Sequence, residues 1–303
     1  MDLLTTAAAA AAGIILGFIA VIVAVAAAAS RKMVSPPRAR GSWTPRDLGH
    51  DYEDVEVVAP DGVRLRGWFI DKGSDKTVLA IHGYTSSRWD ETYMKPVIDI
   101  LARNGFNVAA FDMRAHGESG GDRTTLGKKE AEDMKAVIEW LRRERPERAR
   151  KVGAVGYSMG GAVTIMLAAE PGLLDAAVAD SPYIDIMRSG KRWVRRVRGP
   201  LGVLLRLAYP LIVRLTSRKA GVRPEELNMM RYADRVRAPL LLIAGRRDDL
   251  VAVDEVREFY EAARKANPHV ELWVTDSAHV RTVEDMPGEY EERVVSFLKR
   301  FMG

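Results

Sequence analysis

The sequence of 303 residues contains no cysteine, which excludes disulfides, thiolate metal sites and a thiol nucleophile. Two further absences are local. The segment Leu3 to Ala29 contains no charged residue, and the segment Arg188 to Lys219 contains no acidic one. Ten basic residues lie in the second segment, so the net charge of +5 leaves −5 for the rest of the chain. The positive charge is local, and we do not expect nucleic-acid binding.

The uncharged N-terminal segment predicts a membrane anchor over residues 1–30, followed by a juxtamembrane linker over residues 31–49. A helix over residues 3–29 would be roughly 40 Å long, enough for a hydrocarbon core of about 30 Å. The alternative is a cleaved signal peptide with small residues near Ala27–Ser30. A signal peptide, however, carries positive charge before its apolar stretch. Here the first positive charges, Arg31 and Lys32, follow the stretch, which predicts a single-pass anchor with the rest of the chain in the cytoplasm.

Small residues recur four positions apart in this segment, as at Ala9, Gly13 and Gly17. Such spacing lets two membrane helices approach closely, and one interpretation is a homodimer through the anchor. An alanine-rich run also produces this spacing by chance.

Beyond residue 50, short apolar runs alternate with helical patterns. This alternation predicts an α/β fold, with a mostly parallel sheet of about eight strands and helices on both faces. An antiparallel pair around Asp61-Gly62 opens the pattern. The buried-strand candidates are Thr77–Ile81, Val108–Phe111, Val152–Val155, Ala176–Ala179, Leu240–Ala244 and Val270–Val274. We expect the core to comprise residues 50–182 and 232–303.

Residues 183–231 interrupt this alternation and predict an inserted helical cap. Two apolar runs, Leu201–Leu205 and Leu207–Val213, lie within the cap, and the break at Pro210 in the second run predicts two short helices rather than one. The whole apolar stretch, about 16 residues long and interrupted, is too short for a second membrane span. The basic and apolar composition suits the surface of a membrane with anionic lipids, although a solvated basic face over a hydrophobic underside would look the same.

The sequence Gly156-Tyr157-Ser158-Met159-Gly160 lies between a predicted strand and a predicted helix. In this context G-x-S-x-G is typical of a sharp turn that presents a nucleophilic serine. A serine hydroxyl needs a base, and the base needs an orienting acid. His279 follows a later strand and is the candidate base, whereas His269 precedes that strand and would lie at the opposite edge of the sheet.

The candidate acid is Asp248, which follows the strand Leu240–Ala244; its neighbour Asp249 and Asp180 are the alternatives. An oxyanion needs two N–H donors. We expect these from the backbone of Met159 and of Tyr84, which lies in the loop after the strand Thr77–Ile81.

Together with His82-Gly83-Tyr84 and Phe111–Ser119, these motifs resemble serine esterases of the α/β-hydrolase superfamily. The resemblance covers residues 50–303 and is nearest to the monoacylglycerol-lipase-like and membrane-anchored lipase branches. It implies that Asp112, Arg114 and His116 brace the fold. The chain departs from the common pattern at Ala252, where proline is frequent, and at Val280, where glycine is frequent.

The resemblance implies a membrane-anchored hydrolase of carboxylic esters, with lipid-derived esters as substrates and no metal or organic cofactor. Its membrane contacts would be residues 3–29 and the basic cap. Alternatives with the same triad are a thioesterase, an acyltransferase or a peptidase; a catalytically silent scaffold that binds lipid or a partner protein is another. From composition alone, we expect an acyl pocket in the cap lined by Leu201, Leu204, Leu205, Leu207, Leu211 and Ile212.

Overall fold

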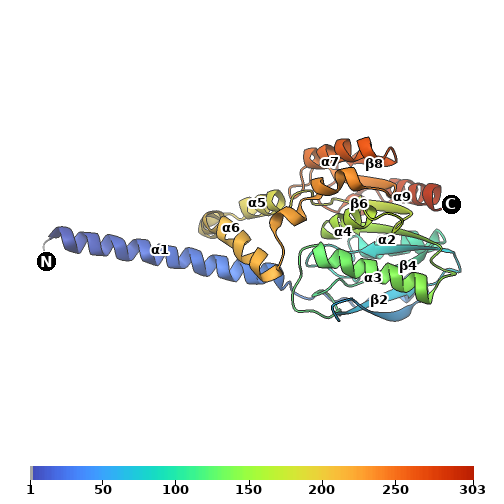
Figure 1. Cartoon of the computed structure of the whole chain (residues 1–303), viewed down its shortest axis with the longest axis horizontal. Helices are drawn as coiled ribbons and strands as arrows, with labels where there is room; N and C mark the ends of the chain where they lie inside the picture. Colours follow the sequence, from blue (N-terminus) through green and yellow to red (C-terminus); the bar gives the residue numbers. More distant parts are fainter. Residues whose placement is uncertain (1–2) are drawn as a thin grey trace.

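The computed structural model describes residues 3–303, and its centre is an eight-stranded sheet (Figure 1). The strand order is β1-β2-β4-β3-β5-β6-β7-β8. Strand β2 runs antiparallel to both neighbours. The six remaining strands of the sheet, β4, β3, β5, β6, β7 and β8 in spatial order, are parallel to one another. The strands are β1 Glu53–Val58, β2 Arg64–Ile70, β3 Lys76–Ile81, β4 Asn107–Phe111, β5 Lys151–Tyr157, β6 Ala176–Asp180, β7 Leu240–Gly245 and β8 Val270–Thr275. The predicted α/β-hydrolase fold is confirmed.

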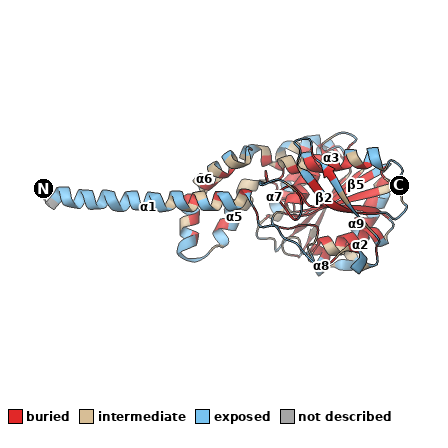
Figure 2. Ribbon diagram, turned by 90° about the horizontal axis from the view of Figure 1, so that it is seen from below, coloured by how far each residue is buried: buried red, intermediate tan, exposed pale blue. Residues whose placement is uncertain are grey.

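Helices cover both faces of the sheet because its central strands are apolar throughout. On one face lie α3 (Lys128–Glu144), α4 (Met159–Ala168) and α7 (Val253–Ala266). On the other lie α2 (Met94–Arg103), α8 (Thr282–Asp285) and α9 (Pro287–Met302). Figure 2 shows that the buried residues concentrate in the sheet and in the helix sides that face it. Short 3₁₀ helices are Pro45–Leu48, Pro224–Leu227 and Met229–Arg235.

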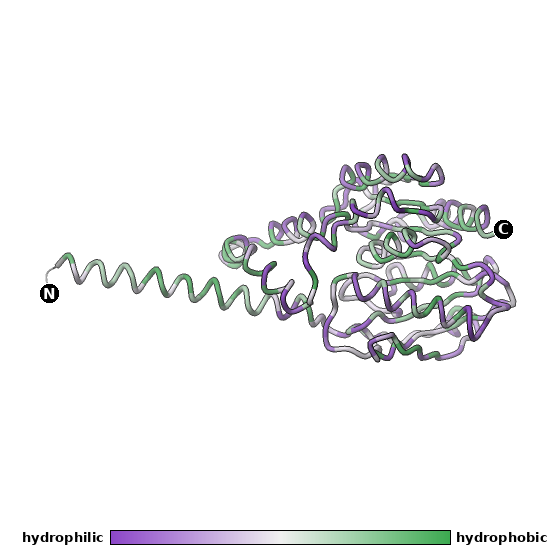
Figure 3. The backbone as a smooth tube through the Cα atoms, viewed as in Figure 1, coloured by the Kyte–Doolittle hydropathy of each residue, from purple (hydrophilic) through white to green (hydrophobic). Residues whose placement is uncertain are grey.

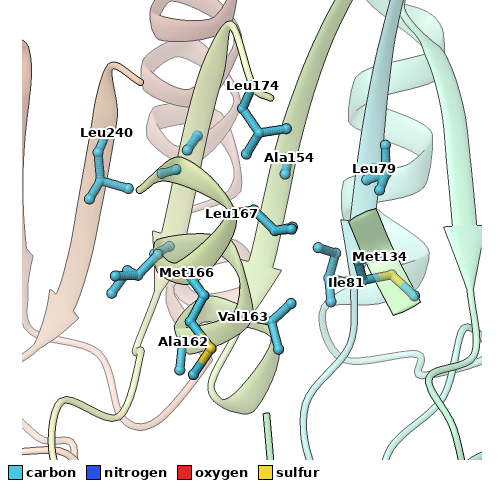
Figure 4. Close-up of a cluster of buried hydrophobic side chains, with 14 of the residues drawn as sticks. Leu79, Ile81, Met134, Ala154, Ala162, Val163, Met166, Leu167, Leu174 and Leu240 are labelled. Carbon is cyan, nitrogen blue, oxygen red and sulfur yellow. The ribbon is translucent and has the colours of Figure 1, made fainter. Parts of the chain in front are cut away.

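Helix α4 is buried on all sides, which fixes the start of the helix where the catalytic chemistry is expected. Figure 4 shows Leu167 and Val163 of this helix beside the strand residues Ala154 and Ile81. Each fully buried aliphatic side chain contributes roughly 1.5–3 kcal/mol. The turn before α4 is therefore held by a rigid core.

Two helices, α5 (Ile186–Arg196) and α6 (Gly199–Ala220), leave the sheet between β6 and β7. The prediction of a helix break at Pro210 is wrong, because α6 is one continuous helix with Pro210 inside it. Proline removes one intrahelical hydrogen bond and costs about 3 kcal/mol in a helix interior. Burial of Ala208 and Ile212, on either side of the proline, offsets that cost. Since α6 is continuous, it also meets the length and composition of a membrane span, contrary to the sequence prediction.

Helix α1 (Leu3–Val34) extends past the expected boundary at residue 30 and has two distinct halves. Residues 4–21 are exposed, and they form the apolar rod that projects from the molecule in Figure 3. This half is about 27 Å long at about 1.5 Å per residue, close to the thickness of a bilayer core. Among residues 3–303, α1 as a whole is one of two helices that are long and apolar enough to cross a membrane.

The inner half of α1 packs against the cap. Ile22, Ala26, Ala29 and Met33 recur at intervals of four and three residues and contact a cluster that contains Leu205, Ala208 and Ile212 of α6. This spacing places one stripe of the helix against its neighbour. The Lys219 ammonium adds hydrogen bonds of 3.2 Å to the Ala27 carbonyl and 2.6 Å to the Ser30 hydroxyl.

The segment after α1 is fastened to the core. The Thr124 N–H donates to the Val34 carbonyl at 2.8 Å, and the Arg38 guanidinium donates to the carbonyls of Gly117, Ser119 and Gly121. The side chain of Trp43 is buried. The segment after α1 therefore holds this helix at a fixed place on the domain.

The two halves of α1 should respond differently to truncation. Residues 4–20 are exposed, whereas side chains between residues 22 and 30 cover the apolar face of α6. Removal of residues 2–20 therefore leaves that face covered, and removal of residues 2–30 uncovers it. We expect the longer truncation to lower the free energy of unfolding by about 2 kcal/mol or more relative to the shorter one. Thermal unfolding of both proteins in one buffer measures this difference. Equal melting temperatures would show that the inner half of α1 does not belong to the folded unit.

Candidate active site

Ser158 occupies the turn between β5 and α4, with φ 53° and ψ −111°. A positive φ is costly for serine and persists only where the surrounding structure enforces it. Glycine is required on both sides of this turn. A Cβ at Gly156 would overlap the Gly160 carbonyl, and a Cβ at Gly160 would overlap the Ile81 carbonyl. The close approach of β3, β5 and α4 thus forces Ser158 out above the carboxyl end of the sheet.

Two hydrogen bonds connect Ser158 to His279 and Asp248. His279 Nε2 lies 2.9 Å from Ser158 Oγ, and His279 Nδ1 lies 2.7 Å from Asp248 Oδ2. A carboxylate only accepts, so Nδ1–H donates to Asp248 and Nε2 is left to accept the serine proton. The structure therefore brings together the three residues that the sequence selected as nucleophile, base and acid.

The surroundings distinguish the candidate carboxylates. Asp248 is buried, and its second oxygen accepts from the N–H groups of Leu250 and Val251 at 2.9 and 2.8 Å. Asp249 points away and forms an ion pair with Arg196 at 3.0 Å. Ala252, where relatives often have proline, has a φ of −71°, which a proline would also adopt. The departure at this position therefore leaves the loop conformation unchanged.

Asp180 lies beneath this group rather than in it. Its carbonyl accepts from the Ser158 N–H at 2.9 Å, and its Oδ1 accepts from the Ser181 hydroxyl at 2.9 Å. The Ser181 oxygen in turn accepts from the N–H of Val280, next to His279, at 3.1 Å. Oδ2 has no hydrogen-bond partner among residues 3–303. Burial raises the pKa of Asp180 to about 7, partly opposed by the Ser181 hydrogen bond.

Val280 has a φ of 53°, the left-handed conformation in which glycine is usual. The hydrogen bond from its N–H to Ser181 holds it there. Sequence reasoning missed this link from Asp180 through Ser181 to the His279 loop. No local pattern could have revealed it, because the three residues come from two separate segments of the chain.

The loop with Tyr84 lies against the serine. A Cβ at Gly83 would sit 3.4 Å from the Ser158 Cβ, so the Gly83-Tyr84 backbone passes directly beside it. Met159 is the first residue of α4, where backbone N–H groups have no intrahelical partner. The Tyr84 hydroxyl donates to the Lys32 carbonyl of α1 at 3.1 Å. The expected anchor helix thus touches the loop beside the serine.

His82 and His116 are buried, and both form hydrogen bonds to the backbone of the loop around Gly83. His82 Nε2 accepts from the Met113 N–H at 2.9 Å, which leaves Nδ1–H to donate to the Gly83 carbonyl at 2.7 Å. Burial lowers the pKa of His82 to about 3, so the ring is neutral.

The Asp112 carboxylate accepts from the Arg88 N–H and from the Arg88 guanidinium. Arg114 bridges Asp61 and Asp133.

The expected pocket residues of the cap need correction. An apolar cavity lies between the end of α1, the two cap helices and the core, with Met33, Leu126, Ile186 and Tyr209 among its lining residues. Of the six residues predicted to line an acyl pocket, Ile212 lines this cavity. Leu205 and Leu211 instead belong to the cluster that packs against α1. Leu204 is half-buried, and Leu201 and Leu207 are exposed to solvent. Helix α1 occupies the apolar face of α6 that the sequence assigned to substrate.

Among residues 3–303, no three His, Asp or Glu side chains lie close enough together to hold a metal ion.

Residues 31–203 match the family described as X-Pro dipeptidyl-peptidase (S15 family). The chain belongs to this S15 family. Among solved structures, the esterase Pf2001 of Pyrococcus furiosus is 46% identical with a TM-score of 0.77, covering 88% of this chain and 100% of that one. A second crystal form of that esterase gives 47% identity and a TM-score of 0.80.

Among curated relatives, the Bacillus subtilis protein YqkD is 27% identical to this chain. The match covers 83% of this chain and 84% of YqkD. The Saccharomyces cerevisiae membrane protein YNL320W is 24% identical, with 79% of each chain covered. The S15 match and the esterase structures establish an α/β-hydrolase that hydrolyses esters or peptides. The resemblance to monoacylglycerol lipases is a finer prediction than these comparisons test.

The buried Asp180 predicts a pH-dependent stability. Its ordinary pKa is 3.8, so between about pH 4 and pH 7 the folded chain holds a proton that the unfolded chain has released. The contribution of Asp180 to the free energy of unfolding therefore falls as pH rises through this interval. Asp180→Asn should remove that loss. Relative to wild type, the variant should therefore be more stable at about pH 8 than at about pH 5, by on the order of a few kcal/mol.

Thermal unfolding of wild type and Asp180→Asn at both pH values measures the change. The exposed Asp249→Asn is the matched control and should show the pH dependence of the wild type. The same pH dependence in Asp180→Asn and wild type would contradict the raised pKa.

Proposed function

We propose that the chain is a membrane-anchored serine hydrolase of carboxylic esters, with lipid-derived esters as substrates. The observation that carries this proposal is the hydrogen-bonded series from Asp248 through His279 to Ser158 on a strained turn. Its geometry matches the roles of acid, base and nucleophile.

The mechanism follows from these positions. As Ser158 Oγ attacks the ester carbonyl, its proton moves to His279 Nε2, and Asp248 stabilises the resulting imidazolium. The N–H groups of Met159 and Tyr84 stabilise the oxyanion of the tetrahedral intermediate. The C–O bond to the alcohol then breaks, and His279 returns its proton to that alcohol. Water, activated by His279, repeats the sequence on the acyl-enzyme and releases the acid.

Two observations support a membrane location, and a membrane supplies lipid-derived esters. The exposed half of α1 has the length of a bilayer core. The yeast relative is described as a membrane protein. Arg31 and Lys32 after the apolar half favour a cytoplasmic location for the domain.

The family match favours peptide hydrolysis as a second candidate, because the same three residues can cleave an amide. Hydrolysis of p-nitrophenyl esters of increasing acyl length and of X-Pro p-nitroanilides, by the full chain in detergent, separates the two. We expect ester turnover with a preference for medium or long chains, lost in Ser158→Ala. Turnover of the anilide alone would contradict the esterase proposal.

The neighbours Asp248 and Asp249 provide a matched pair of substitutions. Asp248→Asn removes the acceptor that holds the His279 tautomer and should lower kcat by about 10³–10⁴. Asp249→Asn only breaks an exposed ion pair with Arg196 and should leave kcat within about twofold. Steady-state kinetics on one short ester measures both. Equal losses in the two variants would overturn the assignment of the acid.

Tyr84→Phe should lower kcat with little change in KM. The lost hydrogen bond to Lys32 loosens the loop that carries the Tyr84 N–H, and a neutral hydrogen bond contributes about 0.5–1.5 kcal/mol, or up to about tenfold in rate. Tyr260→Phe on α7 is the control and should keep wild-type kinetics. An unchanged kcat in Tyr84→Phe would show that α1 does not position the oxyanion donor.

A further inference from the structure

The outer end of the cap combines exposed apolar and basic side chains. Trp193, Leu201, Val203 and Leu207 are each between 48% and 55% exposed, although large apolar residues usually avoid solvent. Arg195, Arg198 and Arg206 lie among them and are exposed as well. We call these seven residues the cap tip.

Three cations of the cap are paired with carboxylates of the core: Arg188 and Arg192 with Glu255, and Arg196 with Asp249. Among residues 3–303, no Asp or Glu oxygen lies within ion-pair distance of Arg195, Arg198 or Arg206. Carboxylates of the core therefore neutralise cations on the side of the cap that faces the core, and the cap tip keeps its positive charge.

The position of the cap tip follows from α1. Figures 1 and 2 both place the turn between α5 and α6 at the end of the cap away from the sheet, beside α1. The packed half of α1 begins at Ile22, and the exposed half runs on from there for the thickness of a bilayer core. If residues 4–21 span the membrane, the cap tip lies at the level of the lipid headgroups.

We propose that the cap tip docks on the surface of a bilayer that contains anionic lipids; this inference rests on the membrane anchoring proposed above. The arginines contact headgroup phosphates, because the negative surface of such a bilayer attracts basic residues that lie near it. The tryptophan and the aliphatic side chains enter the interfacial layer, where amphipathic and apolar groups are favoured. The cap is thereby held at two places, by α1 and by the lipid surface.

The absence of native cysteine allows a direct test with single spin labels on the full chain in lipid nanodiscs. Labels are placed at Leu201→Cys in the cap tip, Ile14→Cys in the exposed half of α1, and Glu292→Cys on α9 at the far side of the domain. Collision with oxygen, which is enriched in lipid, and with a water-soluble nickel chelate reports whether each label lies in lipid or in water. Discs contain phosphatidylcholine with or without phosphatidylglycerol.

We expect the Leu201 label to be shielded severalfold from the nickel chelate in anionic discs and much less in neutral ones. The triple substitution Arg195→Gln, Arg198→Gln and Arg206→Gln should abolish this shielding. A matched triple substitution of exposed core arginines, Arg235→Gln, Arg257→Gln and Arg264→Gln, should not. Unchanged melting temperature and turnover of a short ester would show that the cap-tip variant is folded.

A Leu201 label in water on anionic discs, while the Ile14 label lies in lipid, would overturn the docking proposal and leave the anchor intact. Equal shielding in neutral and anionic discs, unaffected by the cap-tip substitutions, would also overturn it. An Ile14 label in water would overturn the anchoring itself, and this proposal with it. The Glu292 label should remain in water throughout.

Discussion

The turn between β5 and α4 is the constraint on which the rest of the site depends. Only glycine fits at positions 156 and 160, because the backbones of β3, β5 and α4 meet there. That crowding forces Ser158 into a positive φ and lifts its hydroxyl above the sheet. The parallel strands β7 and β8 end at the same edge, which brings the Asp248 and His279 loops to the hydroxyl. The strain at the turn is sustained by a core that buries α4 completely.

A second feature is the integration of α1 with the domain. A simple tether would leave the enzyme free to rotate, but here the inner half of α1 packs on α6 and its last turn bonds Tyr84. Met33 of the same turn lines the cavity beneath the cap. Helix α1, the cap and the loop beside the serine form one contiguous set of contacts. In the proposed function, membrane position and substrate site are therefore mechanically connected.

Much of the fold was predictable because it depends on local patterns. Apolar runs such as Leu240–Ala244 fixed the strands, and the order of Ser158, Asp248 and His279 indicated which loops meet. The choice of Asp248 over Asp249 required the structure, because only the structure shows which of the two adjacent side chains points toward His279. The cap was predicted less well. Pro210 is accommodated by packing against a helix almost two hundred residues earlier in the chain, and the apolar face of α6 is covered by α1 rather than left for substrate. Such long-range burial leaves no signature in a short window.

The central claim is that Ser158 is a nucleophile activated by His279. The most direct measurement is covalent labelling of the full chain in detergent with a fluorophosphonate, located by mass spectrometry. The account predicts one phosphonylated residue, Ser158, with labelling that slows by orders of magnitude in His279→Ala while the fold is retained. Labelling at another residue, or equal rates in wild type and His279→Ala, would contradict it.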